Sequence, residues 1–236
     1  MKRSLKIFKL FNSFKNKFDD IKKDYKELPI ANENFIDAIF APVFFVTISR
    51  FQNLQTSIIL TGSLIMFTFL YRILRKESLR NSLIGVGGTS IALLIAQIQG
   101  TASGFFLPGI IRDLSIASIG FVTILMGRPF TIYTSKSIRG WPLGWFLHEK
   151  VKPAYREVAI IWVVFLGLKG LIQLYFFSSP EILAVIKLAT SNQTTIFLLV
   201  LTYIYGQKKL IRLGGPSVEE YRNNISPPWS SQQSGF

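Results

Sequence analysis

The sequence contains no cysteine and a single histidine, His148. The absence of cysteine excludes disulfide bonds, thiol chemistry and cysteine-bound zinc. One histidine is too few for a histidine-built metal site or a relay of histidines. We therefore expect neither a metal nor another cofactor.

Acidic residues are scarce as well, with 13 aspartates and glutamates against 27 lysines and arginines. The net charge of +14 is typical of proteins that bind nucleic acid and of membrane proteins whose loops face anionic headgroups. The distribution of the charge decides between them, because the cations lie mainly between apolar segments. We expect the lipid bilayer and its anionic lipids as partners, and no nucleic acid.

Charge is almost missing from Val158 to Phe177, where Lys169 is the one charged residue. At ~1.5 Å per residue this stretch spans ~30 Å, the thickness of the hydrocarbon core of a bilayer. A helix of this length in a soluble protein would need a polar face, which this stretch lacks. It predicts a membrane-spanning helix with a cation inside it.

Apolar segments recur through residues 34–206 and predict an all-α polytopic membrane protein with six transmembrane helices. The six segments are Phe35–Ser49, Ser57–Tyr71, Ser82–Gln97, Pro108–Gly127, Glu157–Ser178 and Ile182–Tyr205.

Residues 1–29 and 207–236 flank this six-helix domain. In the first, apolar residues recur at spacings of four and three among nine lysines and arginines, which predicts a basic amphipathic helix in the membrane interface. The same spacing also fits a short coiled coil. The second is polar and contains the run SPPWSSQQSG, so we expect a disordered cytoplasmic tail.

The cations of the loops predict the orientation in the membrane. All but four of the 27 lie on one side of the predicted bundle, and positive residues stay in the cytoplasm, so both termini are expected there. A cysteine at Ser103 should then react with an impermeant thiol reagent in intact cells, whereas one at Ser135 should not. The four exceptions are Arg50, Arg112, Lys169 and Lys187, of which the first and last can reach the outer surface with their long side chains.

The candidate site is an intramembrane polar cluster of Arg112, Asp113, Lys169 and Gln173. Each charge inside a bilayer costs ~2.5–3.5 kcal/mol on insertion scales, so each needs a reason. Asp113 and Lys169 fall on antiparallel helices, ~8–13 Å below the outer surface, and we expect them to pair. Gln173 should complete the shell, while Arg112, rotated by ~100° from its neighbour, should point elsewhere. The sequence is compatible both with a structural Asp113–Lys169 ion pair and with a substrate or ion site.

The loop between the fourth and fifth segments mixes aromatic residues with cations. Aromatic rings at headgroup depth fix helix ends in the interface, and cations beside them can bind anionic lipids. The residues expected to contact lipid headgroups are Arg128, Lys136, Arg139, Trp141 and Trp145.

Four stretches carry a resemblance to a known family: Ile36-Asp37 with Pro42, the run Phe105–Ile110, Arg128-Pro129, and the fifth segment with Trp162, Phe165, Gln173, Leu174 and Tyr175. In these stretches the chain resembles an uncharacterised bacterial integral-membrane family, a domain of unknown function common in actinobacteria. More distantly, it resembles intracellular septation protein A. The resemblance implies a multi-pass bundle in the bacterial inner (plasma) membrane and no known reaction. Lys169 stands where that family usually has arginine, which keeps the cation but loses a bidentate fork.

Two functional hypotheses follow. The first is a non-enzymatic membrane bundle, for permeation of a small solute or ion or as a cell-envelope scaffold. The alternative is a membrane-embedded lipid-modifying enzyme, which needs paired carboxylates for a metal or a nucleophile with a base near the headgroups. Only Glu149 and Glu157 approach this, and each lies among cations, so we favour the first. The oligomeric state is left open.

Overall fold

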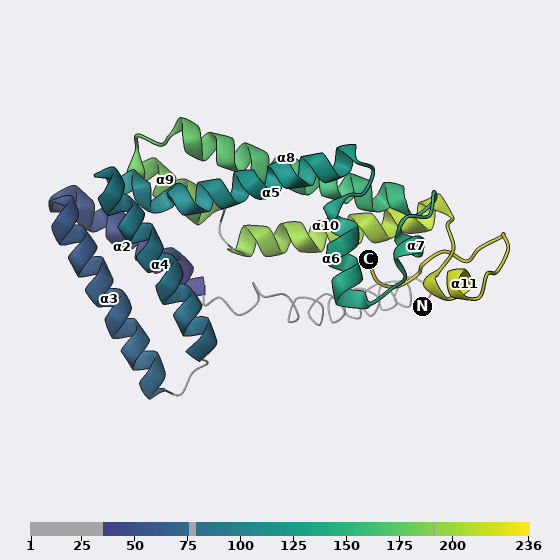
Figure 1. The fold of residues 1–236 in the computed structure, drawn as a ribbon, viewed down its shortest axis with the longest axis horizontal. Helices are drawn as coiled ribbons and strands as arrows, with labels where there is room; N and C mark the ends of the chain where they lie inside the picture. The colour runs from purple at the N-terminus through teal and green to yellow at the C-terminus, as the bar shows by residue number, and fades with distance from the viewer. Residues whose placement is uncertain (1–34, 76–78, 191) are drawn as a thin grey trace, which may run out of the picture. The chain divides into compact units, whose positions relative to one another are not determined.

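A computed structural model describes residues 35–75, 79–190 and 192–236. The expected amphipathic helix of residues 1–29 lies outside these residues. The described chain is helical and contains no strand. Its elements are α2 (Phe35–Phe51), α3 (Leu54–Leu74), α4 (Leu79–Gln99), the 3-10 helix η2 (Ala102–Phe106), α5 (Leu107–Leu125), α6 (Phe130–Arg139), α7 (Leu143–Phe146), α8 (Lys152–Tyr175), α9 (Pro180–Ala189), α10 (Asn192–Leu213) and α11 (Val218–Arg222) (Figure 1).

Three segments of the described chain are long and apolar enough to cross a membrane: α3, η2 with α5, and α8. A fourth is obtained if α9 and α10 together form one broken span. The described apolar parts of α2 and α4, Phe40–Phe51 and Gly85–Gln99, are shorter. The all-helical membrane fold is thus confirmed with three to four candidate spans, whereas six remains a prediction.

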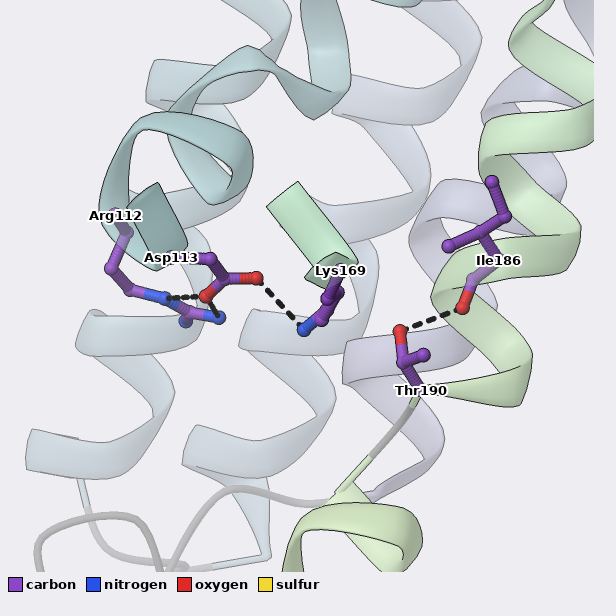
Figure 2. Close-up of polar contacts among 5 residues, drawn as sticks. All are labelled: Arg112, Asp113, Lys169, Ile186 and Thr190. Carbon is purple, nitrogen blue, oxygen red and sulfur yellow. Dashed lines mark hydrogen bonds and ion pairs between the residues drawn. The ribbon is translucent and has the colours of Figure 1, made fainter. Parts of the chain in front are cut away.

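The sixth predicted segment, Ile182–Tyr205, is not one helix. The end of α9 is closed by Thr190, whose backbone N–H donates to the carbonyl of Ile186 at 2.9 Å. The side-chain hydroxyl of Thr190 donates to the same carbonyl at 2.7 Å (Figure 2). Thr194 donates in turn to the carbonyl of Ala189 at 2.7 Å. Hydroxyl groups that bond nearby carbonyls offer the backbone an alternative to continuing the helix. A hydropathy pattern averages over such a polar interruption.

The chain divides into two compact units, which are described separately. We call Asn32–Ile119 with Trp162–Ile196 the bundle unit. We call the described residues Gly120–Ile161 and Phe197–Phe236 the aromatic unit.

The core of the bundle unit lies where η2 packs against α2, α4 and α9. Phe45 of α2 and Phe105 of η2 stack with their ring centroids 4.9 Å apart. Gly104 allows the approach of η2 to α4, because a Cβ there would lie 2.8 Å from the Cα of Ala96. The Phe-Phe-Leu-Pro-Gly stretch therefore joins a tightly packed 3-10 turn to the start of α5.

The core of the aromatic unit is centred on Trp145, Phe146 and Tyr155, which are fully buried. Their rings meet edge to face at centroid distances of 5.1–6.3 Å. The indole N–H of Trp145 donates to the carbonyl of Pro216 at 2.8 Å, and Thr131 donates to the carbonyl of Tyr155 at 2.8 Å. Three aromatic residues of the loop that the sequence places at the lipid headgroups thus form the core of a small folded unit.

The expectation of a disordered tail over residues 207–236 is wrong. Helix α10 continues to Leu213, and α11 begins with a capping box in which Ser217 and Glu220 each accept from the other's backbone N–H. The backbone N–H groups of Ser217 and Ser230 lower the pKa of the Glu220 carboxyl to about 2. The physical reason is non-local, because the polar residues of the tail bond to α10 and α11 and its last aromatic ring enters the core.

Candidate functional site

Two cations converge on one buried carboxylate in the bundle unit. Lys169 of α8 places its amine 2.8 Å from Oδ2 of Asp113 on α5. Arg112 donates to the other oxygen, Oδ1, from Nε at 3.1 Å and from Nη2 at 2.9 Å. Figure 2 shows the three side chains around the carboxylate. We call them the ion triad, and its formal charge is positive because two cations share one anion.

The three members of the ion triad differ in exposure. The side chains of Asp113 and Lys169 are 3% and 7% exposed, whereas that of Arg112 is 57% exposed. Removal from water is costly for an ion unless a partner of opposite charge compensates. The Asp113–Lys169 pair is such a compensated pair, and Arg112 adds a third charge at its accessible edge.

One glycine of α8, Gly170, allows this approach to α5. At Gly170 an added Cβ would lie 2.6 Å from Cδ2 of Leu114, so the leucine side chain occupies the space that a side chain there would need. At Gly167 a Cβ would meet Ala117 at 3.8 Å, an ordinary contact. Small residues let helix backbones approach closely, so Gly170, next to Lys169, helps position the lysine beside the carboxylate, whereas Gly167 is not required for this.

The expected pairing of Asp113 with Lys169 is present, but the expected direction of Arg112 is wrong. The ~100° rotation between consecutive residues places the Cα atoms on different faces of the helix. The arginine side chain is long enough to fold back around the helix and reach its neighbour. Sequence spacing describes Cα positions and does not account for this reach.

Gln173, the fourth residue of the predicted cluster, is 3% exposed. Its side-chain oxygen is buried and has no hydrogen-bond partner. This oxygen makes no hydrogen bond to the triad, so the place of Gln173 in the shell stays a prediction. A buried, unsatisfied acceptor of this kind costs stability or serves a ligand or a water.

A further cation approaches the same face of α5. The amine of Lys187, on α9, lies 3.9 Å from the position that a Cβ on Gly109 would take. Gly109 precedes Asp113 by four residues, which places both on one face of the helix, about 6 Å apart along the axis. The amine of Lys187 thus lies against α5, and its reach to the outer surface stays a prediction.

The residues predicted to contact lipid headgroups separate into two groups. Arg128 and Lys136 are exposed, and lipid contact at these positions stays a prediction. For Trp145 the expectation is wrong, because the side chain is fully buried. Arg139 is half-buried, lies 4.9 Å over the ring of Trp141 and donates from Nε to the carbonyl of Phe236 at 3.0 Å. Aromatic rings interleaved with cations are typical of headgroup belts and of a small aromatic core alike.

Sequence reasoning also missed the partners of Glu157. Its carboxylate accepts the hydroxyl of Tyr205 at 2.5 Å and pairs with the amine of Lys209 at 2.8 Å. Both partners lie about 50 residues away on α10. No local pattern joins positions so distant in the chain.

The family of the chain follows from a match over residues 32–210, which contain α3, η2 with α5, α8 and the ion triad. The chain belongs to the family described as a protein of unknown function (DUF3159). The resemblance to an uncharacterised family is thereby confirmed. The DUF3159 match ends within α10, so α11 and the tail lie outside it. No curated protein and no solved structure matches this chain.

Proposed function

We propose that this protein is a non-enzymatic, multi-pass protein of a bacterial plasma membrane, and that its ion triad binds a small anionic solute during permeation. The observation that carries the proposal is the convergence of Arg112 and Lys169 on the single carboxylate of Asp113 between apolar helices. A structural pair needs one cation for one carboxylate. A third charge costs ~2.5–3.5 kcal/mol on insertion without improving that balance, so it calls for a functional reason.

The geometry of Arg112 supports an anionic ligand. Its guanidinium has five N–H donors, and Asp113 takes two of them. The planar fork suits carboxylate-like or phosphate-like anions, and the 57% exposure of the side chain leaves it accessible. The amine of Lys187 beside Gly109 adds to the positive potential on this face of α5.

The full topology belongs to the same proposal. In it, α2 and α4 also cross the bilayer, α9 with α10 forms the sixth, broken span, and both termini are cytoplasmic. The cations of the loops support this orientation. Arg128 and Lys136 would then face the anionic headgroups of the inner leaflet. The bacterial setting rests on the resemblance of the sequence to inner-membrane proteins.

Single cysteines test the topology, because the chain has none of its own. Ser103 is a poor probe, since it is only 4% exposed. Ser178, between α8 and α9, and Ser137, on α6, are both exposed. In intact cells, Ser178→Cys should be labelled by an impermeant maleimide, whereas Ser137→Cys should be labelled only after lysis. The opposite pattern would invert the proposed orientation.

Anion flux tests the proposed function. The purified chain, reconstituted into vesicles, should release chloride, nitrate or acetate faster than empty vesicles do, and potassium no faster. Arg112→Gln should lower the anion flux about tenfold, which corresponds to the loss of ~1.4 kcal/mol of binding. The variant should still fold, because the Asp113–Lys169 pair remains.

The matched control is Arg222→Gln, which removes an exposed cation of α11 and should leave the flux unchanged. Thermal unfolding of the wild-type, Arg112→Gln and Arg222→Gln chains in detergent verifies that each of them folds. If the wild-type chain conducts none of these anions, or if Arg112→Gln conducts like the wild type, the permeation proposal is wrong. The triad would then act as a structural lock in an envelope scaffold.

A further inference from the structure

Residues 229–236 end in an aromatic ring that enters the core of the aromatic unit. The ring of Phe236 stacks on that of Tyr155, with centroids 4.3 Å apart and planes inclined by 9°. The ring of Tyr203, on α10, meets it edge-on at 6.5 Å. Phe236 thus contributes to the packing of a core whose other members lie far from it in the sequence.

The pocket around this ring is shaped by a glycine and an arginine. At Gly206 a Cβ would overlap the ring of Phe236, so the absence of a side chain leaves the space that the ring occupies. Arg139 donates from Nε to the carbonyl of Phe236 at 3.0 Å. The pocket therefore recognises both an aromatic side chain and the peptide carbonyl beside it.

The pocket also restricts the residue that precedes the aromatic one. Gly235 has a φ of 84°, a conformation that favours glycine. A Cβ at this position would lie 2.6 Å from Nη1 of Arg139 and 2.9 Å from the ring of Trp141. The pocket thus accepts a glycine followed by an aromatic residue, and a larger residue before the ring would collide with its wall.

The rest of the segment is attached by hydrogen bonds, one of them from the buried side chain of Gln207, and by the ring of Trp229. Ser230 donates to Glu220 from its backbone and its hydroxyl, both at 2.8 Å, and Gln207 donates to the carbonyl of Gln233 at 2.6 Å. Lys150 lies 5.3 Å from the ring centre of Trp229. The ring of Trp229 also meets that of His148 edge-on at 5.3 Å, so two rings, Trp229 and Phe236, supply the apolar attachment. The net contribution of each hydrogen bond is modest, since water can replace it.

We propose that Arg139, Tyr155, Tyr203 and Gly206 form a binding site for a Gly-aromatic peptide, which residues 229–236 occupy in cis and can vacate for a peptide in trans. This goes beyond anion permeation and does not depend on it. The attachment through two rings and several exchangeable hydrogen bonds makes the segment displaceable. The steric selection of glycine favours a peptide over a lipid headgroup as the ligand.

The test uses the full chain in detergent and a fluorescent peptide of residues 226–236. Phe236→Ala empties the pocket, so this chain should bind the peptide at least tenfold more tightly than the wild-type chain, whose own segment competes. The same peptide with Phe236→Ala should not bind. The double variant Gly206→Leu with Phe236→Ala should not bind either, because the leucine fills the space of the ring.

Arg139→Gln combined with Phe236→Ala provides a second variant that leaves the space open. It should weaken peptide binding roughly tenfold, the effect of losing a hydrogen bond to a charged donor. Size-exclusion profiles establish that each chain is folded. Equal binding by wild-type and Phe236→Ala chains, or binding by neither, would contradict the proposal. So would increased binding of Phe236→Ala to anionic vesicles without peptide binding, which would indicate a lipid site.

Discussion

Asp113→Asn is expected to lower the free energy of unfolding by ~3–5 kcal/mol, the usual cost of removing one partner from a buried ion pair. The carboxylate accepts from both Lys169 and Arg112, so its loss leaves a 7%-exposed amine without its partner and places two cations side by side. Asparagine has nearly the same volume, so the effect is electrostatic. Thermal or denaturant unfolding in detergent measures it.

The double variant Asp113→Asn with Lys169→Gln should recover most of this loss. Removing both buried charges eliminates the unpaired ion, and such replacements are often close to neutral. The coupling energy of the cycle should therefore be large, ~2–3 kcal/mol, because the two groups are in direct contact. Additive effects of the two substitutions would contradict the pairing. A double variant that folds and yet conducts no anion would show that the triad has a functional role beyond stability.

Trp145→Ala is also expected to lower the free energy of unfolding by ~3–5 kcal/mol, because a large buried side chain is lost. Trp145 is fully buried, and its ring contacts those of Trp141, Phe146 and Tyr155 at centroid distances of 5.1–6.3 Å. Trp145→Phe separates packing from hydrogen bonding, because it keeps an aromatic ring and leaves the carbonyl of Pro216 without its donor. Trp145→Phe should lower the free energy of unfolding by ~1–3 kcal/mol.

Trp141→Ala is the matched control, since Trp141 lies at the edge of the same core and is only half-buried. Its replacement should destabilise the chain less than Trp145→Ala does. The unfolding of both variants, Trp145→Ala and Trp141→Ala, is followed by near-ultraviolet circular dichroism. If Trp145 instead lay among lipid headgroups, Trp145→Ala would weaken binding to anionic vesicles and leave the unfolding midpoint unchanged.

The ion triad shows which contacts can be predicted from the sequence and which cannot. The pairing of Asp113 with Lys169 could be predicted because the rise of a helix is constant, so residue counts give depth in antiparallel helices. The contribution of Arg112 could not be predicted in this way, because it depends on the conformation of a long side chain. The role of Gly170 was only suggested by its size, since the side chain that fills its space, Leu114, belongs to another helix.

In the aromatic unit, the burial of Trp145 could not be predicted from the sequence. Trp145 among cations is a pattern shared by membrane-interface belts and by aromatic cores. The hydrogen bond of Trp145 to Pro216, 71 residues away, distinguishes the two, and no local pattern contains it. The composition of the tail predicts disorder, but its order depends on the stacking of Phe236 on Tyr155, a residue distant in the sequence.

The sequence by itself determined the helical class, the apolar segments and the membership of the family. These properties depend on composition, on hydrophobic length and on the fixed rise of a helix, all of which are local. The tertiary structure decided which side chains share the Asp113 carboxylate, where the sixth segment breaks and what fills the pocket beside Gly206. Those outcomes depend on side chains brought together from distant parts of the chain, and their packing and electrostatic energies exist only once the helices have met.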